Sequence, residues 1–181
     1  MKSLEKNDKA PEFTVLDTDD RSISLHDYKG KFLLLSFYRY ASCPFCNLRV
    51  DESIRYQASR DIKLLAVFQS PKEKVALYVG RQSLNFPILP DPQKNLYKLY
   101  GLKSSWFGLI KAMLTHIPRI IKSIIIKGFY PGSMENGASQ LPADFLIGPK
   151  GEIVIAFYGK DISEHLSFEK IDEAISRYNM T

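Results

Sequence analysis

Two cysteines three residues apart are the side chains of this sequence best suited to chemistry. Cys43 and Cys46 enclose Pro44 and Phe45, and the chain of 181 residues has no other cysteine. Proline is favoured at the first position of a helix, so the spacing predicts a helix that begins at Pro44 and carries Cys46 on its first turn. Free N–H groups and the positive end of the helix dipole stabilise a thiolate there. This arrangement is typical of thiol–disulfide exchange, in which one sulfur attacks and the other resolves the mixed disulfide.

Zinc binding and an inert pair of thiols are the alternatives for these cysteines. A closed zinc site needs four ligands, commonly two such pairs. Here no second pair exists, and His26, His116 and His165 are scattered along the chain. Redox chemistry is therefore the favoured interpretation. Because the thiols supply the electrons themselves, no metal and no cofactor are expected.

The composition predicts a single globular domain. The chain is 45% hydrophobic and 12% aromatic, and its length favours one core rather than two. Residues 1–11 are polar and predict a mobile leader without the apolar segment of a secretory signal. No apolar run approaches the ~20 residues that span a bilayer. We therefore expect a cytoplasmic protein, and in that compartment a cysteine pair is more often redox-active than structural.

The positive charge is concentrated in one part of the sequence. The net charge is +5, and five basic residues stand against one acidic residue between positions 101 and 140. The sequence has no long basic run and no stripe of alternating basic and aromatic residues, so nucleic acid is not an expected partner.

Strands alternate with helices along the chain, which predicts an α/β fold with a mixed central sheet flanked by helices. Apolar runs, turn residues and helical periodicity locate these elements. Strands are expected at 13–16, 22–25, 32–38, 63–68, 86–89, 145–147 and 153–156, the last two forming a hairpin. Helices are expected at 44–59, 72–81, 91–100 and 167–178.

The segment 104–130 does not fit this alternation. Apolar residues recur at helical spacing up to Ile117, and Pro118 then interrupts the pattern and would begin a second helix. We interpret 103–139 as a helical insertion that packs on the core or forms a homodimer interface. Alternatively, residues 104–130 contact an anionic membrane surface or a partner's groove, or overhang the cysteine pair and restrict which disulfides enter.

Several short motifs, in order, resemble the peroxiredoxin-like (alkyl hydroperoxide reductase/thiol-specific antioxidant) family. They are 10–14 (APEFT), 24–31 (SLHDYKGK), 86–91 (FPILPD) and 100–102 (YGL). The resemblance covers the chain apart from 103–139 and is closest to the subgroup that carries Cys-X-X-Cys. It implies a thioredoxin fold and an antioxidant or redox-homeostasis role, with Cys43 as the exposed nucleophile and Cys46 as the resolving thiol.

The sequence departs from true peroxiredoxins at the residues that activate peroxide. That family places a Pro seven residues, and a Thr or Ser three residues, before the attacking Cys. Counting back from Cys46 gives Arg39 and Cys43, and counting back from Cys43 gives Ser36 and Tyr40. Neither register supplies both groups. A disulfide reductase or isomerase is therefore favoured over a peroxidase in which Cys46 would attack the peroxide.

Pro142 is the third candidate site residue. By resemblance it takes the position of the cis-proline that faces the cysteine pair in thioredoxin-like folds. We therefore expect a cis Leu141–Pro142 bond within contact of Cys43, and a role for Pro142 in substrate binding. The alternative is an ordinary proline at the start of a strand, since only about 5% of X–Pro bonds are cis.

Three polar residues near the motif are further candidates, and two of them have two interpretations. Arg39 either lowers a thiol pKa or is solvated at a strand end, and Tyr40 lines the mouth of the site. Asp144 either relays a proton to Cys46 or is a solvated or hydrogen-bonded carboxylate.

A thiol–disulfide oxidoreductase is the favoured function. Cys43 would attack a disulfide of a protein or small molecule, and an external thiol reductant, thioredoxin-like or glutathione, would restore the pair. In the first alternative, a thiol-dependent peroxidase, hydroperoxide oxidises one cysteine to sulfenic acid, which condenses with the other. In the second alternative the fold is a non-catalytic module that binds a partner or a membrane surface through 104–130.

Overall fold

The computed structural model describes residues 3–104, 132 and 139–180 of the chain. Most of the predicted insertion at 103–139 lies outside the described residues. The predicted homodimer, membrane and partner contacts of 104–130 also concern residues outside the described part of the chain. Among the described helices, none is long and apolar enough to cross a membrane.

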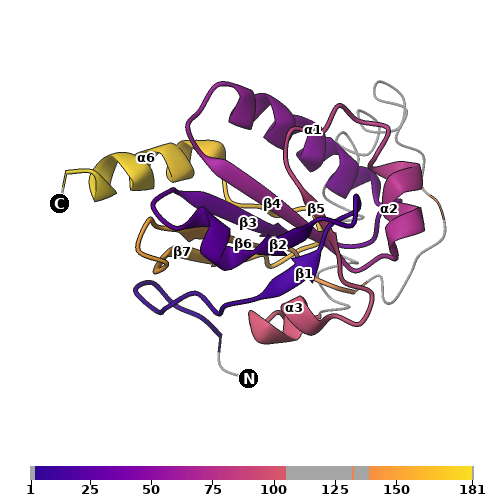
Figure 1. The fold of residues 1–181 in the computed structure, drawn as a ribbon, viewed down its shortest axis with the longest axis horizontal. Coiled ribbons are helices and arrows are strands. Elements are labelled where there is room, and N and C mark those ends of the chain that lie inside the picture. Colours follow the sequence, from indigo (N-terminus) through magenta and orange to yellow (C-terminus); the bar gives the residue numbers. More distant parts are fainter. Residues whose placement is uncertain (1–2, 105–131, 133–138, 181) are drawn as a thin grey trace.

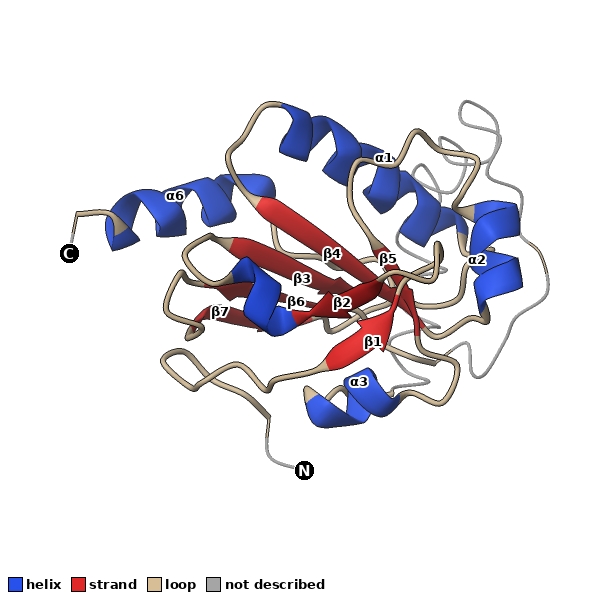
Figure 2. Ribbon diagram, viewed as in Figure 1, coloured by secondary structure: helices blue, strands red, loops and turns tan. Residues whose placement is uncertain are grey.

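A five-stranded mixed sheet forms the centre of the fold (Figures 1 and 2), in the order β5–β4–β3–β6–β7. The strands are β3 (Leu33–Phe37), β4 (Lys63–Phe68), β5 (Ile88–Pro90), β6 (Ala143–Ile147) and β7 (Ile153–Tyr158). The first three are parallel to one another, and β6 and β7 run antiparallel to their neighbours. Every residue of β3 is buried, which explains its uninterrupted apolar sequence.

Helices cover both faces of this sheet (Figure 1). The α-helices are α1 (Pro44–Ala58), α2 (Lys72–Tyr78), α3 (Asn95–Leu99) and α6 (Phe168–Tyr178). Leu34 and Leu64 pack with buried residues of α1, α2 and α6, whereas Leu33, Leu35 and Leu65 pack with α3 and the N-terminal segment. These leucines divide between the two faces of the sheet because successive side chains along a strand point to opposite faces. A ribbon of β1 (Thr14–Leu16) and β2 (Ser22–Ser24), followed by a short 3₁₀ helix at Leu25–Tyr28, lies outside the main sheet.

The predicted mixed sheet flanked by helices is confirmed, with small differences at element ends. The helix expected at 91–100 begins only at Asn95. Its start is delayed because the Asp91 carboxylate accepts hydrogen bonds from the N–H groups of Asn95 (2.9 Å) and Leu96 (2.8 Å). Asp91 therefore satisfies the free donors of the first turn from outside the helix.

The N-terminal segment is not a mobile leader over residues 4–10. Asn7 N–H donates to the Ile153 carbonyl (2.8 Å), Ile153 N–H donates to the Asp8 carbonyl (2.8 Å), and Ala10 N–H donates to the Gly151 carbonyl (2.9 Å). The segment thus pairs with the edge of β7. The prediction of a mobile leader is wrong because backbone hydrogen bonds, which side-chain polarity does not report, hold this segment.

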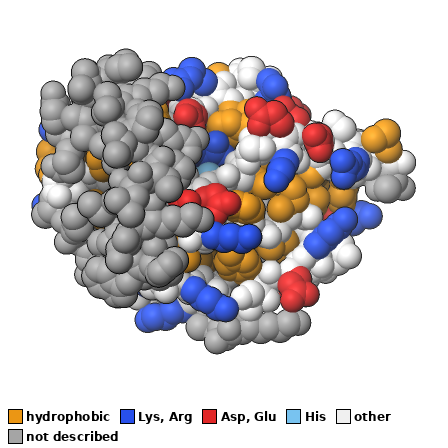
Figure 3. Space-filling model, turned by 180° about the vertical axis from the view of Figure 1, so that it is seen from behind, with side chains coloured by type: hydrophobic (Ala, Val, Ile, Leu, Met, Phe, Trp, Pro, Cys, Tyr) orange, Lys and Arg blue, Asp and Glu red, His pale blue; other side chains and the backbone are white. Residues whose placement is uncertain are grey.

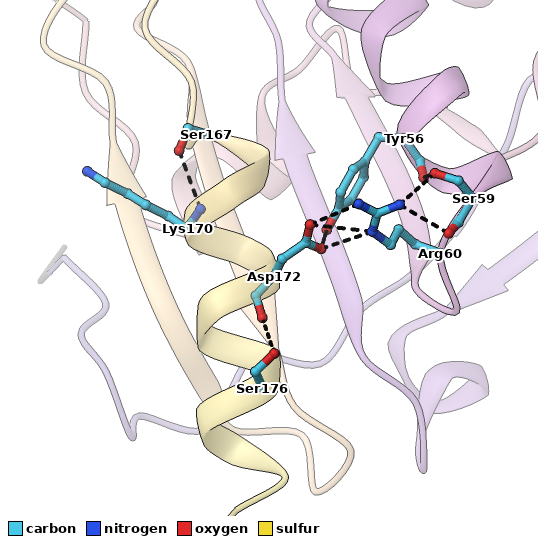
Figure 4. A network of polar contacts seen from close by, with 7 residues as sticks. All are labelled: Tyr56, Ser59, Arg60, Ser167, Lys170, Asp172 and Ser176. Carbon is cyan, nitrogen blue, oxygen red and sulfur yellow. Dashed lines mark hydrogen bonds and ion pairs between the residues drawn. The ribbon is translucent and has the colours of Figure 1, made fainter.

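A polar clamp joins the end of α1 to α6 (Figure 4). The Tyr56 hydroxyl donates to Asp172 Oδ1 at 2.8 Å, and Arg60 Nη2 lies 3.2 Å from Asp172 Oδ2. The Tyr56 ring also stacks on Phe168, with ring centroids 4.2 Å apart. The clamp fixes the first turn of α6 against the helix that carries the cysteines.

Candidate functional site

The cysteine pair lies at the start of α1, as predicted. Cys43 is the N-cap residue with extended backbone dihedrals, Pro44 is the first helical residue, and Cys46 lies on the first turn. Both cysteines are free thiols. The helix begins directly after the loop that follows β3, so the most buried strand of the sheet positions the motif.

Arg39 lies within this site. Its Nη1 donates to Cys43 Sγ at 3.4 Å, and its backbone N–H donates to Cys46 Sγ at 3.4 Å. Its guanidinium lies 4.9 Å from the centroid of the Tyr40 ring, and the residue is only 1% exposed. Of the two interpretations left open above, a solvated arginine is therefore wrong, and Arg39 touches both sulfurs.

The two thiols have opposite pKa shifts. Burial raises the pKa of Cys43, but the hydrogen bond from the Cys46 thiol, the Arg39 charge and the N–H groups of Cys46 and Phe45 together lower it to about 6. Burial raises the pKa of Cys46 well above its ordinary value, and the hydrogen bond to the Cys43 thiolate and its charge add to that shift. One proton therefore stays on Cys46 while Cys43 is a thiolate at neutral pH.

This difference predicts a pH dependence of the stability of the reduced protein. The folded pKa of Cys43, about 6, lies below the roughly 8.5 of an unfolded thiol. The stabilisation by the thiolate is therefore fully present above about pH 8.5 and is lost as the pH falls through about 6. Between these values the unfolding free energy rises by up to about 1.4 kcal/mol per pH unit.

Denaturant unfolding at several pH values measures this slope. The Cys43→Ser variant is the control, because it keeps the other titrating groups and lacks the thiolate. Equal slopes for the reduced protein and the variant between pH 6 and 8.5 would contradict a depressed Cys43 pKa.

Neither sulfur is exposed, contrary to the expectation of an exposed nucleophile. Cys43 is 0% exposed and Cys46 is 1% exposed, whereas Pro44 and Phe45 between them are only half-buried. Next to Cys43 in the sequence, Ser42 lies beside Gly132, which packs so closely on Tyr78 that a β-carbon there would collide with the tyrosine. The prediction was wrong because it considered the helix start alone and not what packs over it. A disulfide reaches Cys43 only after the residues that bury its sulfur move apart.

The expected cis bond before Pro142 is absent. Every described peptide bond is trans, including Leu141–Pro142. The Pro142 carbonyl accepts a hydrogen bond from Gly159 N–H (2.9 Å), and Leu141 N–H donates to the Lys103 carbonyl (3.3 Å). Pro142 is thus a strand-start proline directly before β6. The prediction was wrong because it relied on the resemblance to thioredoxin-like folds, although the trans form of an X–Pro bond has the lower free energy. Without a cis bond, the reason to place Pro142 in the site is lost.

Asp144 is a fully buried, hydrogen-bonded carboxylate. His165 Nδ1 lies 3.0 Å from Asp144 Oδ2, and Leu166 N–H donates to the same oxygen at 2.7 Å. Burial raises the pKa of Asp144, but His165, the Arg49 charge and the Ser36 side chain together outweigh this effect, and the net shift is downward. The second interpretation of Asp144 therefore holds. The pairing with His165, 21 residues away, had no signal in the sequence.

Comparison with known proteins identifies the family. Residues 7–156 match the family model described as the AhpC/TSA family. The chain belongs to the AhpC/TSA family. The resemblance found in the sequence motifs is thereby confirmed.

The relatives of this AhpC/TSA chain include bacterial peroxiredoxins. A candidate peroxiredoxin of Mycobacterium tuberculosis H37Rv is 31% identical over 101 residues, which are 54% of this chain and 64% of the relative. Peroxiredoxin Bcp of Escherichia coli K12 is 25% identical over 105 residues, 56% of this chain and 67% of the relative. The matched part thus spans only about two thirds of these relatives.

Solved structures share the thioredoxin fold of this chain, which confirms the predicted fold class. Peroxidoxin BcpB of M. tuberculosis superposes with a TM-score of 0.65 at 14% identity, covering 98% of this chain and 97% of its own. A candidate thiol:disulfide interchange protein DsbE of Chlorobium tepidum gives 0.62 at 17% identity, covering 97% and 98%. At this identity the likeness concerns the fold alone.

Proposed function

We propose that this AhpC/TSA chain is a thiol–disulfide oxidoreductase with Cys43 as its nucleophile and Cys46 as its resolving thiol. The observation that carries the proposal is the placement of both cysteines at the start of α1, with Arg39 Nη1 donating to Cys43 Sγ at 3.4 Å; the lowered pKa of Cys43 and the raised pKa of Cys46 agree with it. A thiolate is the reactive form in disulfide exchange, and a second thiol within bonding reach completes the cycle.

The reaction begins when the Cys43 thiolate attacks one sulfur of a substrate disulfide. The substrate S–S bond breaks, a mixed disulfide with Cys43 forms, and one substrate thiolate leaves. Cys46 then gives up its proton and attacks the Cys43 sulfur, which releases the second substrate thiol. The protein ends with a Cys43–Cys46 disulfide, having lost two electrons to the substrate.

An external thiol reductant, thioredoxin-like or glutathione, returns these two electrons by the reverse exchange. A reducing compartment such as the cytoplasm supplies such thiols, and we place the reaction there. Protein disulfides and small-molecule disulfides are both substrates of the proposed type.

Hydroperoxide reduction is the second candidate function, because the relatives are named peroxiredoxins. The resemblance to the family would assign the peroxide-attacking role to Cys46. Burial and the neighbouring Cys43 thiolate raise its pKa well above the ordinary value, and the N–H of Arg39 only partly offsets this, so Cys46 is poorly suited to attack. Arg39 and Cys43 also occupy the two positions whose side chains would activate the peroxide. Disulfide exchange at Cys43 is therefore favoured.

Parallel reactions of the reduced protein separate these two functions. We expect exchange with a disulfide to be faster at pH 7 than exchange by free cysteine, because about nine tenths of a thiol with a pKa near 6 is ionised. Reaction with hydrogen peroxide should exceed that of free cysteine by no more than the same gain in ionisation explains, because no group activates the peroxide. Thiol loss, followed in both reactions, is the measurement. Rapid oxidation by peroxide with slow disulfide exchange would reverse the assignment.

A further inference from the structure

A cavity of about 290 Å³ lies beside the cysteine motif. One wall is the outer side of α1 and includes Phe45, the residue directly before Cys46. The other wall is the loop before α6 and the first turn of that helix. The cavity is of the size that accommodates a small molecule. Phe45, which is half-buried, is the residue of the cysteine motif that lines the cavity, whereas the two sulfurs are buried behind it.

One part of this cavity favours a negatively charged group. Arg49, which is 9% exposed, lines the cavity and stacks over the Phe168 ring at 3.7 Å. One guanidinium nitrogen donates to the Leu166 carbonyl at 2.5 Å, whereas Nε has no hydrogen-bond partner among the described residues. The 11-residue helix α6 begins in the same wall, after its N-cap Ser167. Ser167 Oγ accepts the Lys170 N–H at 3.4 Å, and the helix dipole and the remaining first-turn N–H groups favour a carboxylate there.

Another part of the cavity favours a positively charged group. Glu52, Glu164 and Glu169 line it. The Glu52 carboxylate is 3.8 Å from Arg49 Nη1, at the limit of an ion pair, and Glu164 Oε2 accepts a hydrogen bond from Lys160 N–H at 2.7 Å. The whole chain has a net charge of +5, and Figure 3 shows Lys and Arg side chains together with Asp and Glu side chains on one face.

A ligand of a single charge sign could pair with only one of these two parts, which lie close enough for Arg49 and Glu52 to approach an ion pair. A ligand that carries a carboxylate and an ammonium group on one carbon matches both. Arg49 follows Cys46 by three residues, so the two lie on neighbouring positions of one helix face. Such a ligand would therefore hold its sulfur near the cysteine pair.

We propose that this cavity binds the α-amino acid head group of a small disulfide substrate. The carboxylate lies against Arg49 and the start of α6, and the ammonium group lies against the glutamates. This inference rests on the proposed disulfide exchange at Cys43 and names the class of small disulfide that the site selects.

Four symmetrical disulfides that differ in charge test the proposal. They are cystine, which is zwitterionic at each end, cystamine, 3,3′-dithiodipropionate and 2-hydroxyethyl disulfide. The rate of each with the reduced full-length protein is divided by its rate with dithiothreitol, which removes differences in the leaving thiol. We expect the normalised rate for cystine to be about tenfold or more above the other three and to saturate with concentration.

Variants locate the preference in the cavity. Glu52→Gln and Glu164→Gln should each reduce the cystine preference several-fold, and in the second variant the new amide oxygen can still accept the Lys160 hydrogen bond. Glu173→Gln is the matched control, since Glu173 is an exposed residue of α6 that pairs with Arg177 and does not line this cavity. It should leave the preference unchanged.

The outcomes separate this inference from the proposed function. Equal normalised rates, or a preference for cystamine or dithiodipropionate, would overturn the cavity assignment and leave disulfide exchange in place. A preference for cystine that Glu173→Gln abolishes as strongly as Glu52→Gln would also overturn it. No reaction with any of the four disulfides would overturn both.

Discussion

Replacing Cys43 with Ser will abolish disulfide exchange, whereas replacing Cys46 with Ser will stop the cycle at a stable mixed disulfide. We expect a loss of at least about a thousandfold in turnover for either variant, because nucleophile and resolving thiol act as one unit. Only the Cys46→Ser variant retains the thiolate that attacks. Non-reducing electrophoresis and mass spectrometry after mixing with insulin detect the trapped species.

Cys46→Ala sharpens this experiment. Serine at position 46 keeps a hydroxyl that can donate to the Cys43 sulfur, whereas alanine does not, so the pKa of Cys43 should be higher in Cys46→Ala than in Cys46→Ser. Trapping should then be slower at pH 7 for the alanine variant. A mixed disulfide on Cys46 in the Cys43→Ser protein, formed as fast as the one on Cys43, would contradict the assigned roles.

Replacing Arg39 with Met will raise the pKa of Cys43 towards that of an ordinary thiol. The guanidinium donates to Cys43 Sγ at 3.4 Å in a buried site. The Met variant therefore lacks both the positive charge and the hydrogen bond that stabilise the thiolate. At pH 7 the thiolate fraction falls steeply, but the more basic thiolate is a better nucleophile. We therefore expect exchange with a small disulfide to slow by roughly tenfold. Absorbance of the thiolate against pH gives the pKa directly.

The same variant should shift the reduction potential to a more negative value. Arg39 stabilises the thiolate of the reduced form, and a stabilised reduced form makes a pair more oxidising. Equilibration with glutathione buffers measures this shift. Arg39→Lys should restore part of both effects because it keeps the charge.

Arg55→Met is the matched control for Arg39. Arg55 lies on α1 as an exposed partner of Asp51, and its replacement should change neither the pKa nor the potential. An unchanged Cys43 pKa in Arg39→Met would show that the contact with Arg39 does not set the thiolate.

The sequence contained enough information for the position of the cysteines but not for their surroundings. Pro44 fixed the start of α1 because a proline at the first helical position is strongly favoured, and the structure has Cys43 at the N-cap as expected. The buried strands β3 and β4 could be predicted from the sequence because they are almost wholly apolar. These features are local, and local sequence determines them.

The features that sequence did not reveal depend on contacts between distant segments. Arg39 is a charged residue of a type that is nearly always exposed, and only its contacts with both sulfurs reveal its burial here. Asp144 and His165 meet across 21 residues, and the N-terminal segment is held by backbone groups of β7. The Leu141–Pro142 bond is trans, although the resemblance favoured cis.

Selective alkylation of the reduced protein is the most direct test of the claim that Cys43 is the thiolate of the pair. A limiting amount of iodoacetamide at pH 7, followed by peptide mapping, reports which sulfur reacts first. The opposite pKa shifts predict modification of Cys43 with Cys46 unmodified. Preferential modification of Cys46, or equal modification of the two, would contradict the account.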